Sequence, residues 1–278
     1  MATSDDGRKT LRVAPRGESP VLGRPGGGRS PLLAYVLHSH DWSESSLIVE
    51  LFTRAQGRIV VAAKGAKKPT SNFRAVLLPF APLHAQLGKT PADEQSEVHT
   101  LRSAEWAGGA PMLGAAVMFS GFYLNELLLK LLARQDAQPA LFDAYADTLD
   151  TLATNGDEPA ALRAFELVLL RELGWLPDLS VATDTAQPLD ATARYALHPE
   201  AGLAPEASGL PGPAWVALEA ALTYADRRSG GAALRAACVA VAGPLRGMLR
   251  AMLDYHLGTA QLRTRQVWQG VQRLTSLR

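Results

Sequence analysis

The stretch Ser46-Leu-Ile-Val-Glu-Leu-Phe-Thr-Arg-Ala-Gln-Gly-Arg-Ile-Val-Val-Ala-Ala63 decides the fold of the first part of this chain. Two runs rich in β-branched and aromatic residues lie on either side of Gly57, a pattern typical of two strands joined by a turn. Similar short runs follow at residues 73–80, 83–87 and 98–103, and one precedes at 32–39. Short strands at this spacing, separated by glycine and proline, predict a small antiparallel barrel or sandwich, and an OB-type barrel has this size.

The rest of the chain differs in texture. Residues 1–31 are rich in Gly, Pro, Arg and Ser and bury too little apolar surface to fold, so we expect a disordered basic arm. From residue 111 the apolar residues recur at helical spacing. Helices are predicted at 112–133, 141–152, 159–173, 214–224, 232–256 with a break at Pro244, and 263–274, with a short hairpin near Arg194. The predicted fold class is α+β, with an N-terminal OB-fold β-barrel at 32–110 followed by a mainly α-helical domain at 111–278.

Composition excludes several classes of protein. With 47% hydrophobic and 20% charged residues the 278-residue chain is globular rather than disordered. It has no uncharged apolar stretch of about 18 residues, so we expect no membrane-spanning helix. Its first residues lack the apolar segment of a secretory signal. The single cysteine, Cys238, excludes an internal disulfide and a cysteine-rich zinc site. Together these features predict a protein of the reducing cytoplasm without membrane contact.

Charge is sorted along the chain although the net charge is only +1. Residues 51–92 contain seven Lys or Arg and no acid, residues 111–226 contain sixteen acids and five Lys or Arg, and residues 227–278 contain nine Arg and one acid, Asp254. A local basic excess in a neutral protein indicates a surface that faces a polyanion. The candidate residues for contact with the polyanion are Arg54, Arg58, Lys64, Lys67, Lys68, Arg74 and Arg102.

Motifs of catalysis and cofactor binding are missing. The chain has no phosphate-binding G-x-x-x-x-G-K-[ST] loop, no G-x-S-x-G elbow and no H-E-x-x-H helix. His38 and His40 lie on one face of a strand without a further ligand pair nearby, and Asp143, Asp147 and Asp150 fit an acidic, solvated helix face. We therefore predict no catalytic residue, no metal and no cofactor. Glu126 and Glu166 lie in apolar helices, and Arg163 and Arg171 are their expected partners.

Several segments carry a family resemblance. Tyr35-Val-Leu-His-Ser-His-Asp-Trp-Ser-Glu-Ser-Ser-Leu47, Ala63-Lys-Gly-Ala-Lys-Lys68, Leu78-Pro-Phe-Ala-Pro-Leu83 and Leu162-Arg-Ala-Phe-Glu-Leu-Val-Leu-Leu-Arg-Glu-Leu-Gly174 occur in this order. The ordered set resembles the bacterial DNA repair protein RecO family from about residue 32 onward. Many members of that family carry four zinc-binding cysteines in the helical domain. The corresponding stretch here, residues 179–203, has none, so the chain resembles the metal-free branch.

The resemblance implies a non-enzymatic recombination mediator. Such a protein binds single- and double-stranded DNA, anneals complementary strands, and helps to load the recombinase RecA onto DNA coated by single-strand-binding protein (SSB). The implied partners are RecR, in some members RecF, and the acidic C-terminal tail of SSB. From the residues alone, two alternatives stay open: an RNA-binding or ribosome-associated OB-fold protein, and a metal-dependent nuclease.

A site for the SSB tail needs an apolar pocket with a cation at its rim. Arg163 is the candidate cation, and Leu162, Phe165, Leu124 and Leu128 are the candidate walls. The alternative is that Arg163 pairs with Glu166 and that the apolar residues are core. The C-terminal Arg263, Arg265 and Arg273 are either a second DNA or partner surface or a solubilising face.

Overall fold

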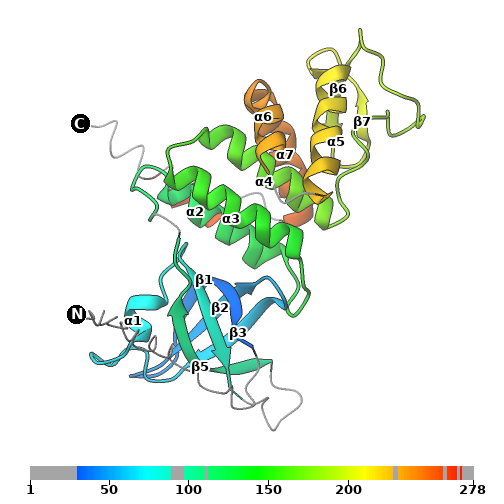
Figure 1. Ribbon diagram of the computed structural model, residues 1–278. Helices are drawn as coiled ribbons and strands as arrows, with labels where there is room; N and C mark the ends of the chain where they lie inside the picture. Colours follow the sequence, from blue (N-terminus) through cyan, green and yellow to red (C-terminus); the bar gives the residue numbers. More distant parts are fainter. Residues whose placement is uncertain are drawn as a thin grey trace, which may run out of the picture.

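The computed structural model of the protein describes residues 30–88, 97–109, 112–227, 231–258, 262–267 and 270. A β-barrel lies at one end, and a bundle of helices covers one side of it (Figure 1). The barrel is closed by β1 (Leu32–Asp41), β2 (Leu47–Thr53), β3 (Gly57–Ala63), β5 (Val98–Trp106) and β4 (Pro82–Leu87), in this order. All pairings are antiparallel except that of β3 with β5. The predicted OB-like barrel is confirmed.

Alternation along the strands builds two cores. Ala34, Val36 and Leu51 point into the barrel and form its interior with the other inward residues of the five strands. Tyr35 and Phe52, directly opposite each other across β1 and β2, point outward and belong to the core of the helical part. A bulge between Val36 and His38 shifts the register of β1. Beyond this bulge the helices no longer cover the outer face of β1, and His38 and His40 are exposed.

The strand expected at residues 73–80 is wrong. This segment forms a short helix, α1 (Phe73–Val76), followed by a loop in which Phe80 has a φ of 69°. Phe73, Val76 and Leu77 all pack against the barrel core, and their spacing of three and four residues is helical rather than alternating. Helix α1 therefore lies between β3 and β4 in the chain and covers part of the barrel interior.

The helical part contains α2 (Met118–Leu131), α3 (Pro139–Ala153), α4 (Glu158–Glu172), α5 (Gly212–Arg227), α6 (Ala232–Val239) and α7 (Ala242–Leu257). The mainly α-helical character expected after residue 111 is confirmed. The first helix begins at Met118 rather than at 112. Gly121 allows Leu113 and Phe80 to pack closely on this helix, because a Cβ there would lie 2.7 Å from Leu113 Cδ1 and 2.8 Å from Phe80 Cε1.

The expected break near Pro244 falls earlier, at residues 240–241, and Pro244 lies in the first turn of α7, where its missing N–H leaves no unmade helical bond. Among the described residues, no single helix is long and apolar enough to span a membrane. The bent pair of α6 and α7 meets the length and composition criteria jointly, with 109° between the helices. The predicted domain boundary at 110/111, the arm up to residue 29, and most of the C-terminal helix after 267 lie outside the described residues.

The hairpin expected near Arg194 is part of a three-stranded sheet. Its order is β7 (Gly202–Pro205), β6 (Arg194–His198) and β8 (Leu210–Pro211). This sheet packs on α7, where Met248 Sδ lies 3.3 Å from the backbone nitrogen of Leu197. The buried indole of Trp215 on α5 donates to the carbonyl of Tyr195 at 3.0 Å. The sheet is therefore held to two helices, α5 and α7.

Candidate nucleic-acid interface

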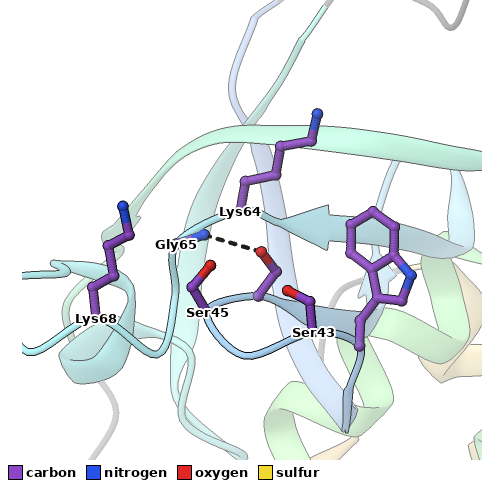
Figure 2. Close-up of a pocket in the computed structure, with 7 residues that line it drawn as sticks. Ser43, Ser45, Lys64, Gly65 and Lys68 are labelled. Carbon is purple, nitrogen blue, oxygen red and sulfur yellow. Dashed lines mark hydrogen bonds between the residues drawn. The ribbon is translucent and has the colours of Figure 1, made fainter.

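A hollow opens at one end of the barrel, between the β1–β2 loop at 42–46 and the turn that follows β3 (Figure 2). Its cavity volume is about 510 Å³. The lining residues are Trp42, Ser43, Ser45, Ser46, Lys64, Gly65 and Lys68. None of the lining residues is acidic, and the Trp42 side chain is 56% exposed. The hollow thus combines an accessible ring, hydroxyl groups and two cations.

The two loops are fastened to each other by local hydrogen bonds. Ser46 Oγ accepts from the backbone nitrogen of Gly65 at 3.3 Å, the dashed line in Figure 2. Gly65 has a φ of +74°, a conformation that favours glycine. Lys67 Nζ donates to the Ser43 carbonyl at 2.9 Å and pairs with Asp41 at 2.8 Å. The Lys67 side chain therefore holds the two loops together.

Lys64 and Lys68 are the exposed cations of this set, and Figure 2 shows both side chains extending away from the loops that carry them. An ammonium group at the surface binds phosphate as a point charge, and serine hydroxyls donate to phosphate oxygens. An exposed indole offers a face on which an unpaired base stacks. The hollow has the chemical groups needed to hold a short piece of single-stranded nucleic acid.

Arg74 and Arg102 extend the basic surface on neighbouring elements. Arg74 lies in the last turn of α1 and Arg102 lies on β5, against which α1 packs, and both are exposed. Neither lines the hollow itself. They add exposed positive charge to elements of the barrel domain outside the hollow.

Arg54 and Arg58 do not join the lysines. Arg54 makes a two-pronged ion pair with Asp143 of α3, with both nitrogen–oxygen distances at 2.9 Å, and this hydrogen bonding raises the pKa of Arg54. Arg58 is 16% exposed, pairs with Glu50 at 3.5 Å and donates to the Leu132 carbonyl at 2.9 Å. Both arginines lie where the barrel meets the helices, so the expectation that all the loop cations reach one groove is not met.

Sequence reasoning missed the charged clamp at this junction. Arg134, in the α2–α3 loop, pairs with Glu50 at 3.0 Å and with Glu97 at 2.9 Å, and these two carboxylates raise its pKa. Glu50 is buried and thus accepts from arginines of both parts of the protein. Gly57 permits the contact, because a Cβ there would lie 1.8 Å from the carbonyl oxygen of Asp136. An acid in the middle of an apolar strand was the available signal.

Glu126 was also assigned the wrong partner. Its carboxylate accepts from the backbone nitrogens of Arg263 and Thr264 at 2.8 and 2.9 Å and pairs with Lys130 at 3.1 Å. Burial acts to raise its pKa, but the hydrogen bonds from Thr264, Arg263 and Lys130 prevail and lower it. Glu126 therefore caps the helical segment at 263–267. Arg171 binds Glu219 on α5 instead.

No metal centre is evident in the part of the chain that the structure describes, where no three His, Cys, Asp or Glu residues are grouped to hold an ion. The rings of His38 and His40 lie 4.2 Å apart on the exposed barrel face. Burial, and then His40, lower the pKa of His38. Cys238 is buried, which raises the pKa of its thiol to about 12 and makes it a core residue rather than a nucleophile.

Comparison with known proteins adds the family. The family model "Recombination protein O N terminal" matches residues 32–109, and "Recombination protein O C terminal" matches residues 116–266. The chain belongs to the RecO family. A DNA repair protein RecO of Acidovorax ebreus (strain TPSY) is 52% identical over 258 residues, which cover 87% of this chain and 96% of the relative. That of Variovorax paradoxus (strain S110) is 51% identical over 253 residues, with the same coverage.

Two expectations drawn from the RecO resemblance can be placed in the structure. Without cysteines, the stretch at 179–203 is held by hydrogen bonds: Thr183 Oγ1 accepts from Leu203 N at 2.8 Å, and Ala182 N donates to the Gln187 carbonyl at 2.9 Å. Gly202 lies so close that a Cβ would be 2.4 Å from Thr183 Oγ1. Hydrogen bonds and close packing within the chain therefore hold this region in place.

The residues expected to grip the SSB tail are not arranged as a surface pocket. Leu124, Leu128 and Phe165 are fully buried, and Leu162 packs against the same core. Arg163 is 8% exposed and pairs with Glu166, 2% exposed, at 2.6 Å. Tyr123 also donates to Glu166 at 2.6 Å. The competing interpretation, that Arg163 pairs with Glu166, describes the geometry, although the pair is buried rather than on the surface.

Proposed function

We propose that this RecO family protein is a non-catalytic recombination mediator that binds single-stranded DNA at the hollow between the loops at 42–46 and 64–68. Family membership supports a role in DNA repair and recombination. The observation that carries the DNA site is the exposed Trp42 ring beside Lys64 and Lys68, with no acid among the lining residues. Its surroundings, Arg74 and Arg102, contribute further positive charge.

The chemistry of the hollow favours binding without sequence preference. Lys64 and Lys68 neutralise phosphates, and Trp42 stacks against whichever base is present. Every base has a π-face, so stacking tolerates sequence, while contacts to phosphate bind single and double strands alike and weaken with salt. A basic surface also lowers the repulsion between two strands, which favours annealing of complementary DNA.

The proposed partners follow from the family. We propose that the protein acts with RecR, and in some settings RecF, to load RecA onto SSB-coated single strands in the cytoplasm, and that it binds the acidic SSB tail. The buried positions of Arg163, Phe165, Leu124 and Leu128 argue against that set as the tail contact. Binding of the SSB tail is therefore proposed from family membership alone, and no residues are assigned to its site.

Removing the cations and the ring of the hollow tests the DNA site. In Lys64→Gln/Lys68→Gln, two lost phosphate contacts should reduce the slope of log affinity against log salt by about 1.4 for single strands. Trp42→Ala should weaken binding by about 1–3 kcal/mol, the range for one stacked base. Fluorescence anisotropy with a labelled oligonucleotide measures both. Arg194→Gln/Arg235→Gln removes the same charge from the helical part and serves as the control.

Unchanged affinity and salt slope in both barrel variants would move the DNA site elsewhere. An RNA oligonucleotide of the same sequence, used as competitor, separates DNA binding from the RNA-binding alternative. Labelled DNA incubated with magnesium or manganese tests for cleavage, which would contradict a non-catalytic role.

A further inference from the structure

The helical part carries a cluster of four arginines that has fewer carboxylates than guanidinium groups among the described residues. Its members come from α4, α7 and the segment at 263–267: Arg163, Arg246, Arg250 and Arg265. The carboxylates that act on them are Glu166 and Asp254. Among the described residues, four guanidinium groups face two carboxylates, which leaves two positive charges without a counterpart there.

Both carboxylates are already engaged. Glu166 pairs with Arg163 at 2.6 Å, and Asp254 lies 3.3 Å from Arg250 Nε and 4.0 Å from Arg265 Nη1. Arg265 Nη1 is buried and has no hydrogen-bond partner among the described residues. Burial, then the charge of Arg250 and that of Arg246, lower the pKa of Arg265. The Asp254 carboxylate and Tyr123 act in the opposite direction, but the pKa is lowered on balance, so an added anion would relieve the remaining repulsion.

We propose that this arginine cluster is a second nucleic-acid surface, on which the exposed Arg246 and Arg250 contact the phosphates of a second strand while the barrel hollow holds the first. The inference rests on the proposed function and extends it, because annealing needs two strands on one protein. Arg163 and Arg265 are mostly buried, so they contribute positive potential to this surface but do not contact the phosphates themselves.

The shape of α7 favours a phosphate backbone. Arg246 and Arg250 are one turn apart, which separates them by about 6 Å along the helix axis, so they form a short row of charge. Gly243 and Gly247 lie in the same turns, both are exposed, and nothing lies within 4 Å of a Cβ built at either position. A polymer strand can therefore approach the helix backbone closely beside the arginines.

An acidic peptide fits this surface less well. Such a peptide needs an apolar pocket for its side chains as well as cations. The neighbouring groove of about 310 Å³, lined by Pro244, Gly247 and Met248 among others, has Glu206 among its lining residues. The Glu206 carboxylate pairs with His198 at 3.0 Å and is 41% exposed. A peptide that needs the groove for its apolar side chains would bring its own acids against this carboxylate, whereas a phosphate backbone that follows Arg246 and Arg250 need not enter the groove.

The test compares first-strand binding with annealing in the full chain. Arg246→Gln/Arg250→Gln removes the two exposed cations, Lys64→Gln/Lys68→Gln removes those of the hollow, and Arg194→Gln/Arg235→Gln is the charge-matched control. Anisotropy measures binding of one labelled oligonucleotide, and fluorescence energy transfer measures annealing to its complement. We expect the Arg246/Arg250 variant to bind the first strand like the control. It should anneal on the order of tenfold more slowly, because steering by charge accelerates association by 10-fold or more. Arg246→Lys/Arg250→Lys should restore annealing.

The outcomes separate the two proposals. Annealing at the control rate in the Arg246/Arg250 variant overturns the second surface, even if the Lys64/Lys68 variant loses binding as proposed. Slow annealing in that variant with normal binding by the Lys64/Lys68 variant supports the second surface and refutes the barrel site. A labelled Asp/Glu-rich peptide with an apolar last residue is the competing probe, and loss of its binding in the arginine variant with unchanged annealing also overturns the inference. Arg246→Gln alone, with half the loss of charge, replaces the double variant if that variant fails to fold.

Discussion

The barrel and the helical part place their charged groups differently. At the open end of the barrel, Lys64 and Lys68 extend from loops into solvent, and the only ion pair beside them, among the described residues, fastens one loop to the other. Inside the helical part, Arg163 and Glu166 are buried together. Surface cations are free to bind phosphate and contribute little to stability, whereas a buried pair is costly to break. The same residue types therefore serve binding in one region and folding in the other.

The largest expected effect is on the buried pair. Arg163→Met leaves Glu166 buried with the Tyr123 hydroxyl as its remaining hydrogen-bond partner among the described residues, and should destabilise the protein by about 3–5 kcal/mol in urea denaturation. Arg163→Met/Glu166→Leu, which removes both charges, should recover most of that loss. Burial already raises the pKa of Glu166 above 4.5 in the native protein. The native state then binds the proton more tightly than the unfolded state, so the cost in the single variant should grow as pH rises from about 4.5.

An equal loss in the single and double variants would show that packing, rather than charge pairing, is what Arg163 supplies. DNA binding by whatever fraction stays folded should be normal. A specific loss of binding to the SSB tail without loss of stability would return Arg163 to the partner site expected from the sequence.

The clamp between the two regions should come next. Glu50→Gln leaves Arg58 and Arg134 facing each other without their shared carboxylate, and should cost about 2 kcal/mol, less than a fully buried pair because Arg134 is 42% exposed. Glu97→Gln is the matched control, since Glu97 binds the same Arg134 but is 58% exposed. Urea denaturation of the two variants compares them. Equal stability of both would mean that burial of Glu50 adds nothing to the junction.

The barrel was readable from the sequence because its signals are local. Runs rich in β-branched and aromatic residues in β2 and β3 and the turn at Gly57 predict the strands, and the lysines after β3 predict the basic loop. The prediction for residues 73–80 was wrong because an apolar run with proline nearby fits a short strand as well as one turn of helix. Only packing of Phe73 and Leu77 on the barrel core decides between them.

The ion-pair partners of the charged residues could not be predicted from local sequence in the same way. Arg54 binds Asp143, which is 89 positions away, and Glu126 caps a segment 137 positions away. Composition shows that charges are sorted along the chain, but which acid neutralises which base depends on how the two regions are packed. The expected set of DNA contacts consequently contained Arg54 and Arg58, which the fold commits to the junction.

The cap on the C-terminal segment should have a moderate effect. Glu126→Gln keeps the shape but removes the charge that accepts from Arg263 and Thr264, and should cost about 1 kcal/mol, as for loss of a helix cap. The native pKa of Glu126 is lowered from 4.5, so its contribution is present above the unfolded value and is lost as pH falls through the native one. Hydrogen exchange of the amides at 263–267 at neutral and acidic pH measures this. Unchanged protection in Glu126→Gln at neutral pH would show that the segment is held by other contacts.

The smallest effect concerns Arg54. It is exposed like the lysines of the hollow, yet it is paired with Asp143 like the buried arginine of the helical part. If the pair persists in solution, Arg54→Gln should leave the salt slope of single-strand binding unchanged. Asp143→Asn should release the guanidinium to a phosphate and steepen that slope by up to about 0.7, the value for one single-strand contact. Salt titrations of a labelled oligonucleotide measure both. A shallower slope in Arg54→Gln would instead mean that DNA displaces Asp143, since an exposed ion pair is weak enough to be exchanged for a phosphate. In that case the junction, and not only the open end of the barrel, would belong to the DNA-binding surface.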